Sequence, residues 1–379
     1  MKIVDVKVHL LSAPIERRYA WNSSLGLSVK RDTVVVEVET DEGITGFGEC
    51  NHALSPKVVA EIIRATLKPL LIGEDPFYIE KIWQKMYKGC RMLGNTGAPI
   101  MALSGVEVAV WDIVGKALKT PIYKLLGAYQ DKIKAYAGGL GLGWKEPQDL
   151  ADEAQGIIKK GFEALKLRVG RGAKADLKSV QAVRLAVGED IDIMLDVNGG
   201  YSRRTALYMA RAFEELGVYW VEEPLPHTDL DGLAELANKV DISIAGGENI
   251  YTTYGFEQAL KKGSFDIVQP DCCKSGGILE AKKIAAMANA SNLPCAPHVF
   301  GTAIQTAISL QLVGSIPNGL IFEFDVLPAN SLLHDLAPNQ FHMKNGFVEI
   351  PNKPGLGIDL DVDAMRKFPF IDGPSYLLS

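Results

Sequence analysis

In the first 125 residues, apolar and polar positions alternate with a period of two along several short segments. The segments "KIVDVKVHLL" and "TVVVEVET" show this most clearly, and such alternation is typical of β-strands with one buried face. "TDEGITGFGE" follows at once and places a turn at Asp41-Glu42-Gly43, so the pattern predicts a β-hairpin. Helices are predicted over 55–70 and 77–88, and "APIMALSGVEVAVWDIVGKAL" is apolar enough to be a buried helix.

Beyond residue 125, short apolar runs alternate with amphipathic helical stretches. Eight alternating β and α units over about 200 residues predict a parallel (β/α)8 barrel. The chain is therefore divided into an α+β domain over 1–125, the barrel over 126–335 and a closing segment over 336–379 that returns to the first domain. The eight runs predicted to be strands are "IKAYAGG", "ALKLRV", "IDIMLDVN", "VYWVEEP", "ISIAGGE", "FDIVQPD", "LPCAPH" and "LIFEFD".

Ionisable residues stand at the carboxyl ends of seven consecutive predicted strands. In a (β/α)8 barrel these ends meet at one face, where catalytic groups converge. A solvated loop charge explains any one of these residues, but the regular recurrence of the whole set favours a common site. The residues are Lys166, Arg168, Asp196, Glu222, Glu248, Asp271, His298 and Glu323.

Three of these residues, Asp196, Glu222 and Glu248, are carboxylates that end neighbouring strands. Packed at one mouth they would repel one another and raise one another's pKa. A hard divalent cation resolves the repulsion, and carboxylate oxygens suit Mg2+, so the spacing predicts a magnesium site. The alternative is that the carboxylates pair with Lys166 and Arg168, which share one face of their strand.

Asp271 and His298 end the next two predicted strands. A carboxylate beside an imidazole fixes its tautomer and stabilises its protonated form, so the pair is a candidate acid/base dyad; a purely structural pair is the alternative. Lys166 and Arg168 are expected to face the same mouth and to hold substrate oxygens, and Lys166 could also move a proton. A metal, two cations and a dyad together suit removal of a proton next to a carboxylate, with stabilisation of the resulting enediolate.

The motifs at these positions resemble those of the enolase superfamily, specifically its mandelate racemase and muconate lactonizing enzyme branch. They are "SGVEVAVWDIVGKALKTPIYKLLG", "LDVNGGY", "VEEP", "AGGEN", "QPDCCKSGG" and "APHVFGT", and the resemblance covers essentially the whole chain. It implies an enolase-type modified barrel capped by an N-terminal α+β domain, which the C-terminal segment completes. It also implies that Asp196, Glu222 and Glu248 are Mg2+ ligands and that Asp271 and His298 form the dyad of the mandelate racemase subgroup.

The resemblance implies further roles as well. Glu323 corresponds to the acid that hydrogen-bonds the substrate carboxylate, and Asn198 falls where a polar residue near the substrate is common. Specificity is expected from the first domain, although ordinary packing or surface exposure explains each of its candidate residues equally well. These are Arg18 and Trp21 in "ERRYAWNSS", His52 in "ECNHALSP", and Arg91.

One position departs from the pattern of the subgroup, in which many members carry K-x-K on the second barrel strand. Here the second lysine is replaced by Arg168, whose guanidinium is a poor base. A one-base reaction led by His298 is therefore favoured over two-base racemisation. The leading prediction is dehydration of an acid sugar; a lactone cycloisomerase or an epimerase is the runner-up, and a non-catalytic sugar-acid binding protein is the third alternative.

The composition of the chain indicates which classes of partner and which cellular compartment to expect. Charged residues make up 23% of the chain and its net charge is −6, which argues against a nucleic-acid partner. An odd number of cysteines, five, argues against a disulfide framework. The N-terminus lacks the apolar block of a signal peptide, and no apolar run has the length of a membrane span, so we expect a cytoplasmic protein. From the family resemblance alone we expect a homo-oligomer.

Overall fold

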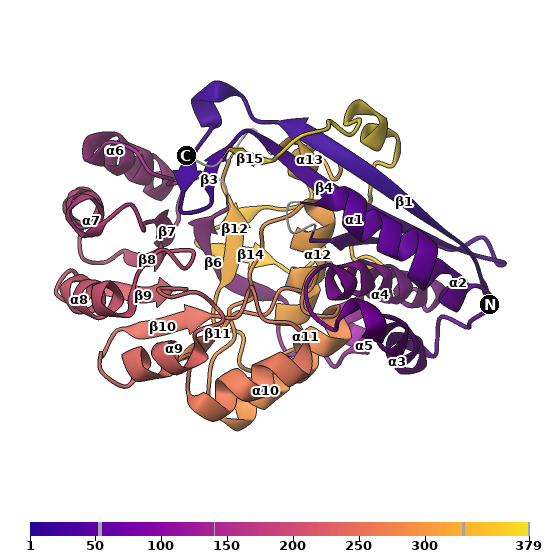
Figure 1. Cartoon of the computed structure of the whole chain (residues 1–379). Coiled ribbons are helices and arrows are strands. Elements are labelled where there is room, and N and C mark those ends of the chain that lie inside the picture. The colour runs from indigo at the N-terminus through magenta and orange to yellow at the C-terminus, as the bar shows by residue number, and fades with distance from the viewer. Residues whose placement is uncertain (52–54, 140, 328–329, 378–379) are drawn as a thin grey trace.

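The computed structural model describes residues 1–51, 55–139, 141–327 and 330–377 (Figure 1). Its N-terminal part contains an antiparallel sheet of three strands in the order β1-β4-β5. β4 and β5 pair in register from Val34–Cys50 to Glu39–Thr45, which confirms the predicted hairpin. The strands of this part are β1 (Ile3–Pro14), β2 (Asn22–Ser23), β3 (Gly26–Ser28), β4 (Lys30–Thr40) and β5 (Thr45–Cys50).

Helices cover one face of this sheet (Figure 1). The predicted helix over 55–70 is present, but a π-helical turn divides it into α1 (Pro56–Glu61), η2 (Ile62–Leu67) and α2 (Lys68–Leu71). α3 (Ile79–Gly89) and the short η3 (Arg91–Leu93) lead into the long apolar helix α4 (Ala98–Ala117).

α4 is the buried helix that the sequence predicts. It lies against β5 so closely that a Cβ atom added at Gly48 would stand 1.9 Å from the carbonyl oxygen of Gly105, so only glycine fits there. Among the described residues, α4 is the one helix long and apolar enough to cross a membrane. However, 94% of its apolar stretch is buried inside the fold, which accounts for its composition.

The barrel has seven regular strands around one ring, in the order β11-β10-β9-β8-β7-β6-β12. The seventh of the eight expected strands, "LPCAPH", is reduced to Cys295, which bridges in parallel to Val268 on one side and to Gly319 on the other and so closes the ring. The regular strands are β6 (Lys132–Gly138), β7 (Ala164–Arg168), β8 (Asp192–Asp196), β9 (Val218–Glu222), β10 (Ser243–Gly246), β11 (Ile267–Val268) and β12 (Phe322–Asp325).

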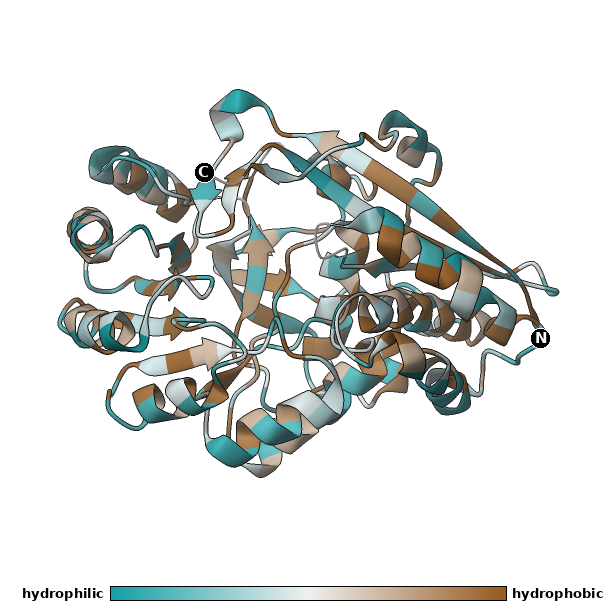
Figure 2. Cartoon of the chain, viewed as in Figure 1, coloured by the Kyte–Doolittle hydropathy of each residue, from teal (hydrophilic) through white to brown (hydrophobic). Residues whose placement is uncertain are grey.

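Helices alternate with these strands and surround them, with apolar faces turned inward and polar faces outward (Figures 1 and 2). The last helix of the series, α13, is a single turn. The helices are α5 (Ile122–Leu125), α6 (Pro147–Ile158), α7 (Ala173–Val187), α8 (Arg203–Glu214), α9 (Leu230–Ala237), α10 (Thr252–Lys262), α11 (Ile278–Ala290), α12 (Ala303–Val313) and α13 (Ser331–His334).

The C-terminal segment contacts both parts of the chain. It first forms the hairpin β13 (Met343–Lys344) and β14 (Phe347–Glu349), and β14 pairs with the amino end of β6 in the barrel. After η4 (Asp363–Lys367) it crosses to the first domain, where β15 (Tyr376–Leu377) pairs with β3. This crossing brings the end of the chain back over the mouth of the barrel (Figure 1).

Candidate active site

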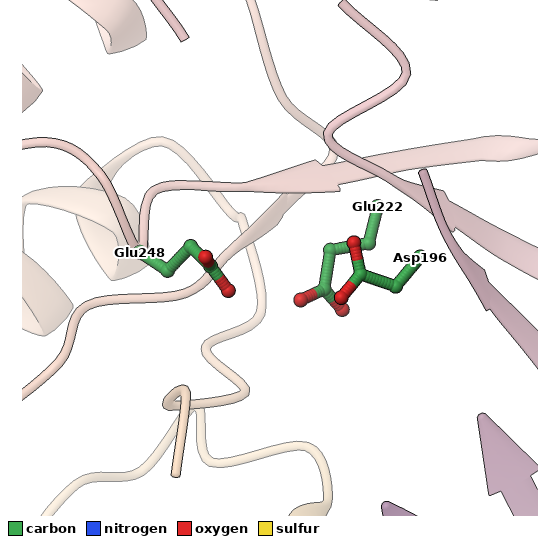
Figure 3. Close-up of side chains that lie close together, drawn as sticks. All are labelled: Asp196, Glu222 and Glu248. Carbon is green, nitrogen blue, oxygen red and sulfur yellow. The ribbon is translucent and has the colours of Figure 1, made fainter. Parts of the chain in front are cut away.

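The carboxyl ends of the barrel strands bring the three predicted metal ligands together. Asp196 ends β8, Glu222 ends β9, and Glu248 follows β10 by two residues. All three are buried, and one carboxylate oxygen from each lies within 4.8 Å of the other two. Figure 3 shows the carboxylates turned toward a common point from both sides.

Two buried cations of β7 stand beside these carboxylates, as the alternative interpretation of the sequence expected. Lys166 Nζ lies 2.9 Å from both carboxylate oxygens of Glu222 and 2.9 Å from Oε1 of Glu323. Arg168 pairs with Asp196. Burial raises the pKa of Glu222 to about 7, although the charge of Lys166 opposes this shift.

The charge balance also fits a divalent cation. The triad, Glu323 and Asp271 supply five buried carboxylates, whereas Lys166, Arg168 and the protonated His298 supply three positive charges. Two negative charges therefore stay uncompensated in a poorly solvated site, and a divalent ion would neutralise them. The donor set, oxygen atoms alone, is the one that Mg2+ prefers.

Glu323 lies beside Lys166 at the barrel mouth, and its expected hydrogen bond to a substrate carboxylate stays a prediction. A hydrogen bond from Glu323 to a substrate carboxylate needs a protonated carboxyl group. Burial alone would raise the pKa of Glu323, but the charges of Lys166 and His298 outweigh it and lower the pKa. Glu323 also accepts a hydrogen bond from the backbone N–H of Val299 at 3.0 Å. The contact between Glu323 and Lys166 helps to fix the position of the Lys166 ammonium group.

The predicted dyad is formed. His298 Nδ1 lies 2.8 Å from Oδ2 of Asp271, whose other oxygen accepts the backbone N–H of Cys273 at 2.7 Å. Because an ionised carboxylate has no proton to donate, Nδ1 carries the hydrogen and Nε2 is directed to the triad, 3.2 Å from Glu248 Oε2. Burial would lower the pKa of His298, but Glu248 and Asp271 raise it to about 9.

Arg168 is held in one position by the protein itself. Besides the pair with Asp196, its Nη1 donates to Asn198 Oδ1 at 3.2 Å and its Nη2 donates to the carbonyl oxygen of Gly139 at 3.2 Å. Its guanidinium also stacks on the Trp21 ring, 4.9 Å from the centroid. Both cations that were expected to hold substrate oxygens are thus engaged by groups of the protein.

Asn249 connects one wall of the site to the triad. Its side-chain N–H2 donates to both oxygens of Glu223, at 2.9 and 2.8 Å, and to Glu248 Oε1 at 3.2 Å. Its Oδ1 accepts from Lys274 Nζ at 2.6 Å. Lysine only donates, so Lys274 fixes the orientation of the amide, with its N–H2 group turned toward Glu223 and Glu248.

A cavity of about 520 Å³ opens above the dyad, between the barrel mouth and the first domain. It is the place for a substrate, because His298, Glu248 and Arg168 all line it. The walls of the cavity also include Trp21, Arg31, Glu49, Asn198, Glu223, Asn249, Lys274, Phe300, Gln305 and Tyr376.

Comparison with known proteins agrees with this geometry. The family model of the mandelate racemase / muconate lactonizing enzyme N-terminal domain matches residues 5–127. The enolase C-terminal domain-like model matches residues 149–364. The chain belongs to the mandelate racemase and muconate lactonizing enzyme family.

Family members similar to this chain act on acid sugars or were solved with magnesium. D-galactarolactone cycloisomerase of Agrobacterium fabrum is 36% identical over 386 residues, covering 98% of this chain and 100% of the relative. Arabinonate dehydratase of Saccharolobus solfataricus is 37% identical over 328 residues, covering 86% and 87%. The crystal structure of a racemase from Streptomyces coelicolor A3(2) with bound magnesium has a TM-score of 0.89 and 31% identity, covering 97% and 99%.

The residues proposed for the capping domain of this family fall in different places. Trp21 lines the cavity, whereas Arg91 is exposed on η3 and is not among the lining residues. The backbone of Arg18 lies in η1 (Arg17–Tyr19), and His52 lies outside the described residues.

Several lining residues escaped the sequence analysis. Arg31 is a charged residue inside an alternating strand, and Gln305 stands in the first turn of a buried, largely apolar helix. Tyr376 reaches the cavity only because β15 returns to β3. Glu223 carried a signal, since it is the second acid of "VEEP", but it was not assigned a role.

Proposed function

We propose that this enzyme dehydrates an acid sugar, an aldonate or aldarate, to a 2-keto-3-deoxy acid, with Mg2+ as its cofactor. The observation that carries the proposal is the buried Asp271–His298 dyad, whose Nε2 faces both the carboxylate triad and the cavity. The chemistry is the removal of the proton next to the substrate carboxylate. Both acid-sugar enzymes compared above support a substrate of this class.

Asp196, Glu222 and Glu248 would hold the Mg2+ ion. When bound, the ion would supply positive charge that stabilises the enediolate produced by proton removal. The charge balance described above and the magnesium bound to the Streptomyces coelicolor racemase support this part of the proposal.

His298 performs the proton transfers. With the charge of Glu248, which raises the pKa of His298, taken up by a bound Mg2+, Nε2 would be free to accept the α-proton, while Asp271 holds Nδ1–H and stabilises the imidazolium. The electron pair of the broken C–H bond forms the enediolate, which expels the hydroxyl group on the β-carbon. The imidazolium returns its proton to that hydroxide, water leaves, and the enol becomes the 2-keto acid.

Arg168 supports a one-base reaction over epimerisation. Epimerisation requires a second group that exchanges protons on the other face of the α-carbon. Arg168 occupies that position of the sequence pattern, and its pKa is raised further, because the charge of Asp196 outweighs the opposing effect of burial. A guanidinium in this state does not act as a base.

A lactone cycloisomerase is the second candidate, because the Agrobacterium fabrum relative is one and matches the whole chain. It uses the same proton removal, but the leaving oxygen belongs to the lactone ring. A non-catalytic binding protein is disfavoured, since binding a sugar acid does not need a buried acid/base dyad.

A panel of aldonates, aldarates and aldarolactones, incubated with Mg2+ in D2O and followed by proton NMR and by a 2-keto acid assay, tests the proposal. Dehydration gives a 2-keto-3-deoxy product, and cycloisomerisation gives an opened product from the lactone alone. Deuterium at an inverted α-carbon of recovered substrate would indicate an epimerase. If no member of the panel reacts or exchanges its α-proton, the proposal is wrong.

A cytoplasmic location and a homo-oligomeric state belong to the same proposal. All five cysteines are free and buried, which agrees with a reducing compartment. Fractionation of the native host and light scattering of the purified protein would test the location and the oligomeric state.

A further inference from the structure

The wall of the cavity that faces the first domain carries buried hydrogen-bond donors that have no acceptor. Trp21 Nε1, Arg31 Nη1 and Gln305 Nε2 each lack a hydrogen-bond partner among the described residues. Their residues line the cavity and are only 3%, 8% and 2% exposed, respectively. The three nitrogen atoms themselves are shielded from the open cavity. Because a buried donor without a partner costs free energy, rotation of these side chains toward a ligand acceptor would be favoured.

The three residues meet around Phe300 and Gly301. The Arg31 guanidinium lies over the Phe300 ring at 4.2 Å and donates through Nη2 to the carbonyl oxygen of Gly301 at 3.2 Å. Trp21 packs edge-on against Phe300, with ring centroids 6.1 Å apart. Gln305 lies against Gly301, where an added Cβ atom would stand 2.0 Å from its Oε1. Phe300 and Gly301 therefore bring the three side chains to one hub.

This hub is close to the reacting groups. Phe300 follows the base His298 by two residues, and the centroids of the two rings are 6.3 Å apart. A sugar acid whose α-carbon is at His298 therefore has its far end within reach of the donors.

Nearby acids do not use these donors. Glu49 accepts from the hydroxyls of Thr33 and Thr302, at 2.8 and 2.7 Å, and from the backbone N–H groups of Thr302 and Gln305. Asp325 is the carboxylate paired with Arg31, but its Oδ2 stays 3.6 Å from Nη1, which is beyond hydrogen-bond distance.

Four other side chains occupy the acids Asp325 and Asp32. Asp325 accepts a hydrogen bond from Asn330 Nδ2 at 2.7 Å. Asp32 pairs with Lys30 at 3.0 Å and accepts from the hydroxyls of Ser12 and Ser375, at 2.6 and 2.7 Å. The wall thus has a surplus of donors and one incompletely compensated cation.

We propose that Arg31, Trp21 and Gln305 form a subsite for a second carboxylate at the far end of the substrate, so that the enzyme selects aldarates over aldonates. A carboxylate accepts up to four hydrogen bonds and carries the charge that Arg31 matches. The hydroxymethyl end of an aldonate accepts at most two and brings a donor of its own to a wall of donors. This inference rests on the proposed function, because it concerns the substrate of the same site.

Calorimetry with the inactive His298→Asn variant and Mg2+ tests the subsite without any turnover. The probes are a hexarate and the hexonate of the same stereochemistry, which differ only at the far end. We expect the hexarate to bind at least about tenfold more tightly. Adding Arg31→Met should weaken hexarate binding about ten- to a hundredfold and change hexonate binding less than about threefold.

Two further variants keep the test decisive. Gln305→Met removes a neutral donor and should weaken hexarate binding about two- to tenfold, which is informative even if Arg31→Met fails to fold. Arg366→Met is the matched control, because Arg366 is 86% exposed on η4 and is not among the lining residues. It should leave both affinities unchanged.

Equal binding of the two acids by the His298→Asn protein would overturn the subsite, as would an equal loss of both affinities in Arg31→Met. The outcome is separable from the proposed function. If discrimination is found but the active enzyme converts neither acid, the dehydratase proposal fails and the subsite stands. If both acids are converted without discrimination, the subsite alone fails.

Discussion

Replacing Arg168 by lysine keeps the positive charge of β7 and removes the planar guanidinium. The change is informative because the K-x-K pattern, to which the sequence was compared, has a lysine at this position, so that pattern alone predicts a tolerated substitution. The contacts in this structure predict the opposite.

The size of the effect follows from the contacts that Arg168 makes. A lysine ammonium could keep the ion pair with Asp196, but it is a single point and cannot also reach Asn198 and the carbonyl oxygen of Gly139, both 3.2 Å from separate guanidinium nitrogens. Leaving the buried Gly139 oxygen without its donor and losing the stacking on Trp21 cost roughly 1.5–3 kcal/mol in total. If that support is needed in the transition state, kcat/KM falls about ten- to a hundredfold.

Steady-state kinetics on the best acid-sugar substrate measures this effect, and a titration of activity with Mg2+ shows whether Asp196 has moved. Proton NMR of the α-carbon in D2O, on both proteins, reports which face of the substrate exchanges. The natural enzyme should show no inversion of the α-carbon.

Two results would contradict this prediction for Arg168. An Arg168→Lys enzyme with unchanged kcat/KM and unchanged Mg2+ dependence would show that the fixed guanidinium contributes nothing to the reaction. Natural enzyme that inverts the α-carbon and incorporates deuterium would show that a group on the Arg168 face carries protons, and the one-base proposal would be wrong.

Three further substitutions test the rest of the site and the fold. Glu222→Gln should abolish activity and weaken Mg2+ binding while the circular dichroism spectrum is retained; full activity in metal-free buffer would contradict it. His298→Asn should remove both turnover and α-proton exchange, an effect of at least about 10²–10⁴-fold, and exchange at the natural rate would make Lys166 the base instead. Glu107 of α4 accepts hydrogen bonds from the backbone N–H groups of Ile278 and Leu279 at 2.8 and 3.0 Å. Glu107→Gln should destabilise the protein by about 1–3 kcal/mol, because the amide would present its own N–H2 donor to one of these N–H groups. Its thermal unfolding should begin several degrees lower, and an unchanged transition would show that this connection between the domains is dispensable.

The sequence predicted the hairpin, the barrel and the convergence of the triad and dyad, because each depends on a local period. Strands of a parallel barrel end at one face, so residues such as Asp196 and Glu222, 26 positions apart, are placed together by topology alone. The seventh barrel strand was overestimated for a local reason. Pro294 and Pro297 flank Cys295 and have no N–H to donate to neighbouring strands, so pairing is limited to one residue.

Residues whose surroundings are distant in sequence could not be predicted in this way. Arg31 appears in the sequence as one polar position of a strand, and its environment is created by Phe300, far along the chain. Arg168 was expected to hold substrate, but pattern alone does not show that Asp196 and Asn198 already occupy its donors. Sequence periodicity predicts which face of an element a side chain lies on, but it does not reveal the hydrogen-bond and ion-pair partners of that side chain.

One loop carries the proposed base and also contacts the residues proposed to select the substrate. The segment between the Cys295 bridge and α12 supplies the base His298 and, two residues later, Phe300. The Phe300 ring contacts the guanidinium of Arg31 at 4.2 Å and lies 5.7 Å from that of Arg168, so it stands between the first domain and the barrel mouth. The dyad is fixed by hydrogen bonds within the barrel, whereas Arg31 arrives from β4 of the first domain. If the proposed subsite is correct, substitutions on the cap side should alter which far end of a substrate is accepted without displacing the base.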